Sequence, residues 1–138
     1  MLISNIPNVE KEYVDLLLKE VQKRSPDILG FSLLLNSGIP IQSTSSIDKI
    51  SDAALSSAMG AAVYNISNKA MIELFEDADL NDVIMQGKKG ILLLRGIEKH
   101  SSILIVMANK VNELGFIYFL VEKITNDICS YLDKQIGK

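Results

Sequence analysis

The chain has few of the side chains that most often carry catalysis or bind metals. Its 138 residues include one cysteine, Cys129, one histidine, His100, and no tryptophan. A single cysteine excludes an intrachain disulfide, and one cysteine with one histidine leaves a structural zinc site short of ligands. The serines that follow His100 in a polar turn are too close in sequence to face it as a catalytic pair must, so we expect a solvated turn histidine. We expect Cys129 to be a small side chain in or beside the core. We therefore predict no catalytic residue, no metal, no cofactor and no enzymatic activity.

Clusters of basic residues and long apolar runs are also missing. The net charge is −3, and the only adjacent basic residues are Lys23–Arg24 and Lys88–Lys89. Nucleic acids and anionic membranes need a basic face, so neither is an expected partner. Gly87–Gly90 has the Gly-x-x-Gly form of a KH-domain loop, but it joins two apparent strands, and we interpret it as a hairpin turn. The longest apolar runs, such as Ile103–Ala108, fall far short of the roughly 20 residues of a membrane span. With no signal-peptide pattern at the start, we expect a cytoplasmic protein.

Apolar residues, in contrast, are plentiful. They make up 48% of the chain, against 22% charged residues. This length is enough for one hydrophobic core, so we expect residues 1–138 to form a single domain. The high apolar content suggests that some apolar surface faces a partner.

Hydrophobic periodicity and turn signals predict three helices and five strands. Asn8 is expected to cap the first helix, and Pro40 places its strand at a sheet edge because proline cannot donate a ladder hydrogen bond. Short turns between strands predict antiparallel pairing. The fold class is therefore α/β (α+β), a five-stranded antiparallel sheet flanked by helices in the order α-β-β-α-β-β-β-α. The expected ranges are 9–23 (helix), 28–35 and 39–44 (strands), 47–75 (helix), 83–86, 91–97 and 102–108 (strands), and 112–135 (helix).

The helix expected over residues 47–75 has an unusually wide apolar surface. Apolar positions sweep about half of its circumference, whereas a surface helix needs a stripe of only ~100°. The extra width implies a second packing partner beyond the sheet. Gly60 inside this helix costs roughly 1 kcal/mol relative to alanine, and close approach by another helix would be one reason to retain it.

An acidic stretch follows at the end of this helix and offers two interpretations. It is either a solvated helix end or a docking surface for a basic partner, and carboxylates are mildly unfavourable at a helix C-terminus. The candidate docking residues are Asp52, Glu73, Glu76 and Asp77. Arg95 lies inside an apparent strand, which is a poor platform for an arginine that must reach into the active site of another protein.

The element order and three segments resemble the Roadblock/LC7 family, which includes MglB-like proteins. The first segment is the hairpin from Ile28 to Ile41, with Asn36-Ser37-Gly38 at its turn. The second is the alanine-rich helix from Ile47. The third is the strand Ile103–Met107 followed by Asn112-Glu113-Leu114-Gly115. The similarity covers about residues 9–131; a departure is Glu113, which separates an asparagine and a leucine that are often adjacent in the family.

This resemblance implies a dimer in which the second helices and third strands meet across a two-fold axis. It implies a homodimer, or a heterodimer with another Roadblock-family chain, and a small Ras-like GTPase as the partner that the dimer regulates or scaffolds. The alternative is a structural adaptor, or light-chain-type subunit, whose binding does not depend on nucleotide. The interface residues implied by the resemblance are Ile50, Ala54, Ala58, Ala61, Val83 and Met85.

Overall fold

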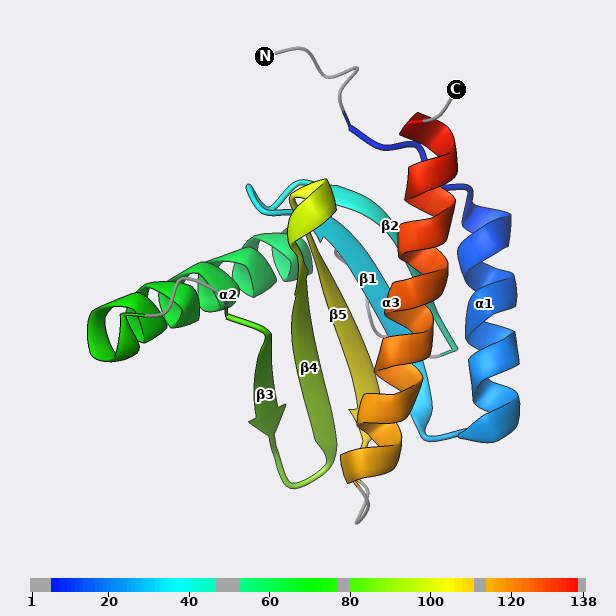
Figure 1. Cartoon of the computed structure of the whole chain (residues 1–138). Helices are drawn as coiled ribbons and strands as arrows, with labels where there is room; N and C mark the ends of the chain where they lie inside the picture. Colours follow the sequence, from blue (N-terminus) through cyan, green and yellow to red (C-terminus); the bar gives the residue numbers. More distant parts are fainter. Residues whose placement is uncertain (1–5, 47–52, 77–79, 111–113, 137–138) are drawn as a thin grey trace.

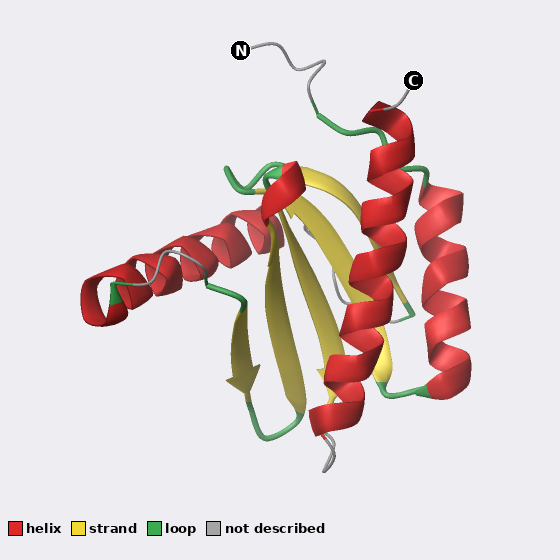
Figure 2. Ribbon diagram, in the orientation of Figure 1, coloured by secondary structure: helices red, strands yellow, loops and turns green. Residues whose placement is uncertain are grey.

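A computed structural model describes residues 6–46, 53–76, 80–110 and 114–136. These residues form the predicted five-stranded antiparallel sheet with three α-helices and one short 3₁₀ turn (Figures 1 and 2). The elements are α1 (Lys11–Arg24), β1 (Ile28–Leu35), β2 (Pro40–Ser45), α2 (Ala53–Phe75), β3 (Asp82–Gln86), β4 (Gly90–Ile97), η2 (Glu98–His100), β5 (Ser102–Asn109) and α3 (Leu114–Ile136). The predicted fold class is confirmed. The predicted helix starts at Ile47 and Asn112 lie outside the described residues.

The strand order in the sheet is β2-β1-β5-β4-β3, and every neighbouring pair is antiparallel. β2 and β3 are therefore the two edges. Pro40 begins the edge strand β2, as predicted, where its missing N–H leaves no ladder bond unmade. Gly87–Gly90 is the hairpin turn between β3 and β4, closed by the Gly87 N–H donating to the Gly90 carbonyl at 2.8 Å.

Helices cover both faces of the sheet, so its central strands are apolar on both sides. Adjacent leucines on β4 show the alternation: Leu93 is buried under α1 and α3, whereas Leu94 is buried on the α2 face. On β5, Leu104 and Ile103 divide in the same way. The larger core lies beneath α1 and α3, and the smaller one beneath the first half of α2 (Figure 2).

The predicted cap of the first helix was wrong. α1 begins at Lys11 with Glu10 at the N-cap position, and Glu10 makes no side-chain capping bond. The carbonyl of Asn8 instead accepts a hydrogen bond from the Gln135 side chain, and the Glu10 N–H donates to the Tyr131 hydroxyl at 3.2 Å. These two hydrogen bonds attach the segment before α1 to α3.

The prediction of a solvated turn histidine was also wrong. The His100 side chain is only 4% exposed, and its Nε2 lies 2.9 Å from Oδ1 of Asp133 on α3. Lys99 Nζ reaches the same oxygen at 3.0 Å. The 3₁₀ turn η2 thus packs against α3. This contact buries the His100 ring, and it involves a residue far away in the sequence.

Candidate protein interface

α2 crosses the sheet near one end and is fixed there by two close contacts. A Cβ placed on Gly60 would lie 2.3 Å from Cδ1 of Ile105, so glycine lets the helix approach β5. The Tyr64 hydroxyl donates to the Leu80 carbonyl at 2.7 Å and so ties the helix to the segment that leads into β3. Within the chain, the close neighbour of Gly60 is the Ile105 side chain of β5, while approach by a second helix stays a prediction.

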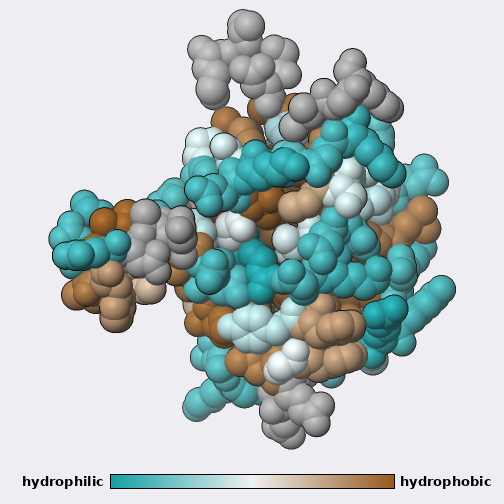
Figure 3. Space-filling model, in the orientation of Figure 1, coloured by the Kyte–Doolittle hydropathy of each residue, from teal (hydrophilic) through white to brown (hydrophobic). Residues whose placement is uncertain are grey.

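Beyond Tyr64, α2 extends past the β3 edge of the sheet (Figure 1). Large apolar side chains on this part are exposed: Ile66 by 70%, Leu74 by 75% and Phe75 by 68%. Figure 3 shows hydrophobic colour gathered on the lower side of the far end of the helix. An exposed apolar surface of this kind is typical of interaction sites between proteins.

An apolar hollow of about 350 Å³ lies beside α2 on the same face of the sheet. One wall is α2 itself, through Ser56, Met59 and Val63, and the floor is formed by β3, β4 and β5, with Phe31 and Ser32 of β1 beside them. The floor side chains are Met85, Leu92, Leu94, Ile105 and Met107. We call this feature the open hollow. It exists because the described part of α2 covers only one end of this largely apolar face.

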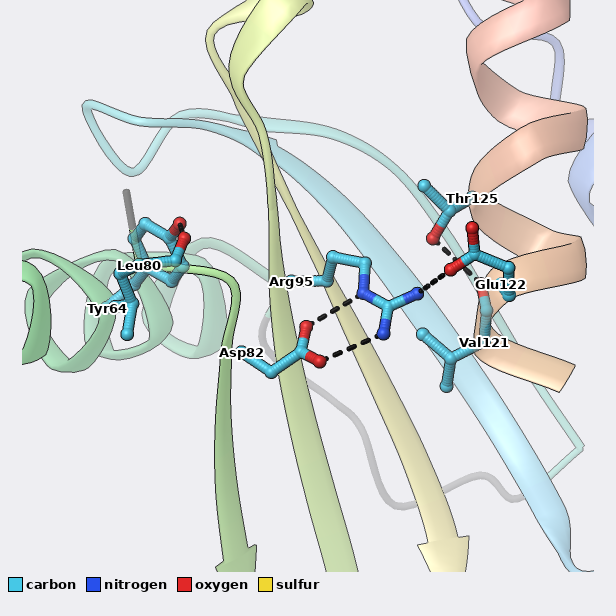
Figure 4. Close-up of polar contacts among 7 residues, drawn as sticks. All are labelled: Tyr64, Leu80, Asp82, Arg95, Val121, Glu122 and Thr125. Carbon is cyan, nitrogen blue, oxygen red and sulfur yellow. Dashed lines mark hydrogen bonds and ion pairs between the residues drawn. The ribbon is translucent and has the colours of Figure 1, made fainter. Parts of the chain in front are cut away.

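The edge strand β3 is held rigidly by a charged cluster (Figure 4). The Arg95 guanidinium donates to both oxygens of Asp82, at 2.7 and 2.9 Å, and to Glu122 of α3 at 2.7 Å. The hydrogen bond with Asp82 is the main cause of the raised pKa of Arg95. The Arg95 and Asp82 side chains are each only 14% exposed, and their bidentate pair joins β3 to β4. The bond from Arg95 to Glu122 joins β4 to α3. Because Nε, Nη1 and Nη2 of Arg95 all donate to carboxylates of its own chain, the guanidinium is directed toward these carboxylates and not toward a partner.

The predicted interface residues divide between the surface and the chain's own core. Ala58 is exposed on α2, and Met85 lies in the open hollow. Val83 is half-buried next to the smaller core. Ala61 is 3% exposed and packs within that core.

Of the other predicted positions, the structure describes only two side chains. Glu73 and Glu76 are exposed at the far end of α2. Ile50, Asp52, Asp77 and the side chain of Ala54 lie outside the described residues.

Sequence reasoning missed the floor of the open hollow. Leu92 and Met107 alternate with core residues on β4 and β5 and therefore point to the α2 face. Period-two alternation could have assigned them to that face. Alternation could not have shown that α2 leaves Leu92 and Met107 partly exposed, because their exposure depends on where α2 crosses the sheet.

The described residues offer little for metal or thiol chemistry. Among them, no group of three or more His, Cys, Asp or Glu side chains is placed to hold a metal ion. Burial raises the pKa of the Cys129 thiol, which disfavours the reactive thiolate. No helix within the described ranges is long and apolar enough to cross a membrane.

Comparisons with known proteins identify the fold. No family model matches the sequence, and no curated protein matches it. Among solved structures, a Roadblock/LC7 domain from Streptomyces avermitilis aligns with a TM-score of 0.74 at 19% identity, over 86% of this chain and 96% of that one. MglB from Myxococcus xanthus aligns with a TM-score of 0.72 at 15% identity, over 90% and 94% of the two chains. The gliding protein MglB from Thermus thermophilus gives 0.76 at 13% identity, over 93% and 96%. The chain therefore has the Roadblock/LC7 fold, as its sequence resemblance predicted.

Proposed function

We propose that the chain is a dimeric protein-binding module that binds a small Ras-like GTPase and regulates or scaffolds it. The observation that carries the proposal is the apolar surface made by the open hollow, the far half of α2 and the free edge of β3. The resemblance to the Roadblock/LC7 family supplies the GTPase, because members of that family commonly bind one. The proposal assigns no reaction to the chain itself.

The geometry of this surface favours a second copy as its cover. An unpaired edge strand is a template for another strand, and two copies of β3 can pair antiparallel about a two-fold axis. Each α2 extends beyond its own β3, so it would lie over the partner's sheet. The two-fold axis places the end of one sheet that carries α2 beside the opposite end of the other sheet. The far half of α2 in one copy would therefore lie over the open hollow of the other copy. Self-association is also described for one solved relative of this fold, an MglB with a tetrameric arrangement.

Within this dimer, Ala58, Val83 and Met85 keep their proposed interface roles, together with Ile50 and Ala54. Met59 joins them, because it is 59% exposed in the wall of the open hollow. Ala61 would support the interface from behind, since it packs α2 onto its own sheet.

The function is tested by affinity capture from an extract of the source cells, with the purified dimer as bait. Parallel captures contain excess GDP or a non-hydrolysable GTP analogue, and beads without bait are the control. We expect a small GTPase enriched in only one nucleotide arm, because a regulator must distinguish the switch conformations of its partner. Equal enrichment in both arms would instead support the structural adaptor. Absence of any GTPase from both arms would contradict the proposed partner.

A further inference from the structure

The two ends of the proposed interface carry opposite charges. The β3–β4 turn presents Lys88 and Lys89, both exposed, and neither side chain forms an ion pair with any described residue. The far end of α2 presents Glu73 and Glu76, which are likewise exposed and unpaired within the described ranges. Carboxylates at a helix C-terminus oppose the helix dipole, so a nearby cation would stabilise this end.

Antiparallel pairing of β3 with a second β3 would bring these charges together. In such a pair, the Gln86 end of one strand lies beside the Asp82 end of the other. The β3–β4 turn of one copy then lies next to the place where the chain of the other enters β3. That place is tied to α2 by the Tyr64–Leu80 hydrogen bond. From there, the far half of α2 continues over the same end of the first copy's sheet.

We infer that Lys88 and Lys89 of each copy hold the acidic end of α2 of a second copy and make the chain select itself. This inference rests on the proposed dimer and names the basic partner of Glu73 and Glu76. Two-fold symmetry makes the contact twice, so each dimer contains two basic turns facing two acidic helix ends. In this dimer, apolar packing in the open hollow accounts for most of the buried surface area, and the charge pairs make the interface specific for a second copy of the chain.

Charge reversal separates this inference from the dimer itself. We compare the wild type with Lys88→Glu/Lys89→Glu and with Glu73→Lys/Glu76→Lys, and measure the dimer Kd by sedimentation equilibrium at about 50 mM salt. Each double variant alone places like charges together at both contacts, so we expect its dimer to be at least about tenfold weaker. The effect should shrink at high salt, where exposed charges are screened.

Mixing the two double variants provides the rescue. In the mixed pair, the new glutamates of one chain face the new lysines of the other. The unchanged lysines of the second chain face the unchanged glutamates of the first. Both contacts are then attractive, and we expect a heterodimer with near wild-type Kd. The control is Lys23→Glu/Arg24→Glu at the end of α1, which reverses the other adjacent basic pair and should leave Kd unchanged.

Each outcome has a defined meaning. A dimeric wild type whose Kd is no more affected by the Lys88/Lys89 reversal than by the control would overturn the inference and leave the dimer standing. Failure of the mixture to recover affinity would also overturn it. A wild type that is monomeric at all concentrations would overturn the proposed dimer and the inference together.

Discussion

Gly96 on β4 is a single position at which the contact between α2 and the sheet can be tested. A Cβ at this residue would lie 2.0 Å from the Tyr64 hydroxyl oxygen and 2.7 Å from Cζ of its ring. Gly96→Ala should therefore displace the ring and break its hydrogen bond to the Leu80 carbonyl. We expect the free energy of unfolding to fall by about 1–3 kcal/mol, measured by urea denaturation at one protein concentration.

A second glycine provides the matched control. Gly115 lies in α3, and a Cβ there would have no neighbour within 4 Å. Gly115→Ala should leave stability unchanged or raise it by up to roughly 1 kcal/mol, because alanine is the better helix former. Equal stability of Gly96→Ala and the wild type would mean that the Tyr64 contact is not a constraint.

At the residue scale, the sequence predicted local chemistry better than distant contacts. The Gly87–Gly90 turn was predicted correctly because its signal is contained in the turn itself. His100 and Asn8 were not, because their partners Asp133 and Gln135 lie far away in sequence on α3. Without the fold, no local rule could place these partners beside them.

At the scale of elements, the attachment of η2 to α3 should depend on pH. The hydrogen bond from Lys99 is the main cause of the lowered pKa of Asp133; burial opposes it, and the hydrogen bond from His100 lowers the pKa further. A carboxyl group whose pKa is lower in the folded state stabilises the fold above its unfolded pKa of about 3.9. That stabilisation is lost as the pH falls through the lower, folded-state pKa.

The variant Asp133→Asn tests this attachment. We expect it to be less stable than the wild type at pH 7 and the difference to shrink below about pH 4, as followed by urea unfolding at several pH values. The control is Glu98→Gln, a residue of the same turn that forms no ion pair with a described residue. A stability difference for Asp133→Asn that stayed constant from pH 7 to pH 3 would show that the carboxylate charge is irrelevant.

Element types and order followed from the sequence, but the division of α2 into two halves did not. β1 has the predicted bounds, and all five strands lie within one residue of where apolar runs and turn signals placed them. The wide apolar surface of α2 is confirmed as a feature of the helix, since Ile66, Leu74 and Phe75 are exposed, whereas the second packing partner that it implies stays a prediction. Periodicity treats every turn of a helix alike, however, and carries no information about where the sheet beneath it ends. The open hollow and the exposed end of α2 both arise from that difference.

At the scale of the whole molecule, the two edges of the sheet are unequal. The β2 edge begins with Pro40 and is covered by side chains: Lys11 Nζ donates to the Ser43 carbonyl at 2.6 Å, and Gln42 donates to the Val9 carbonyl at 3.0 Å. On the β3 edge, Lys110 Nζ donates to the Gln86 side chain at 2.9 Å, but within the described residues no side chain bonds to the β3 backbone, and this edge lies beside the exposed half of α2. Proteins commonly blunt an edge that must not pair, so this asymmetry favours β3 as the pairing edge of the proposed dimer.

One methionine and one leucine with nearly equal exposure provide a test of where the proposed interface lies. Met59 is 59% exposed in the wall of the open hollow, and Leu16 is 58% exposed on α1, across the sheet. Met59→Glu would bury an unpaired carboxylate against the partner's α2, which is strongly unfavourable. Leu16→Glu makes the same kind of change on a face that the proposed dimer leaves in water.

We therefore expect Met59→Glu to have the mass of a monomer in light scattering at micromolar concentration, and Leu16→Glu to keep the wild-type dimer mass. Ala58→Glu should act like Met59→Glu, although it also lies beside the Gly38 turn of its own chain. Circular dichroism would confirm that each variant is folded. A folded Met59→Glu variant with dimer mass would place the interface elsewhere, and loss of the dimer in Leu16→Glu alone would move it to the α1 face.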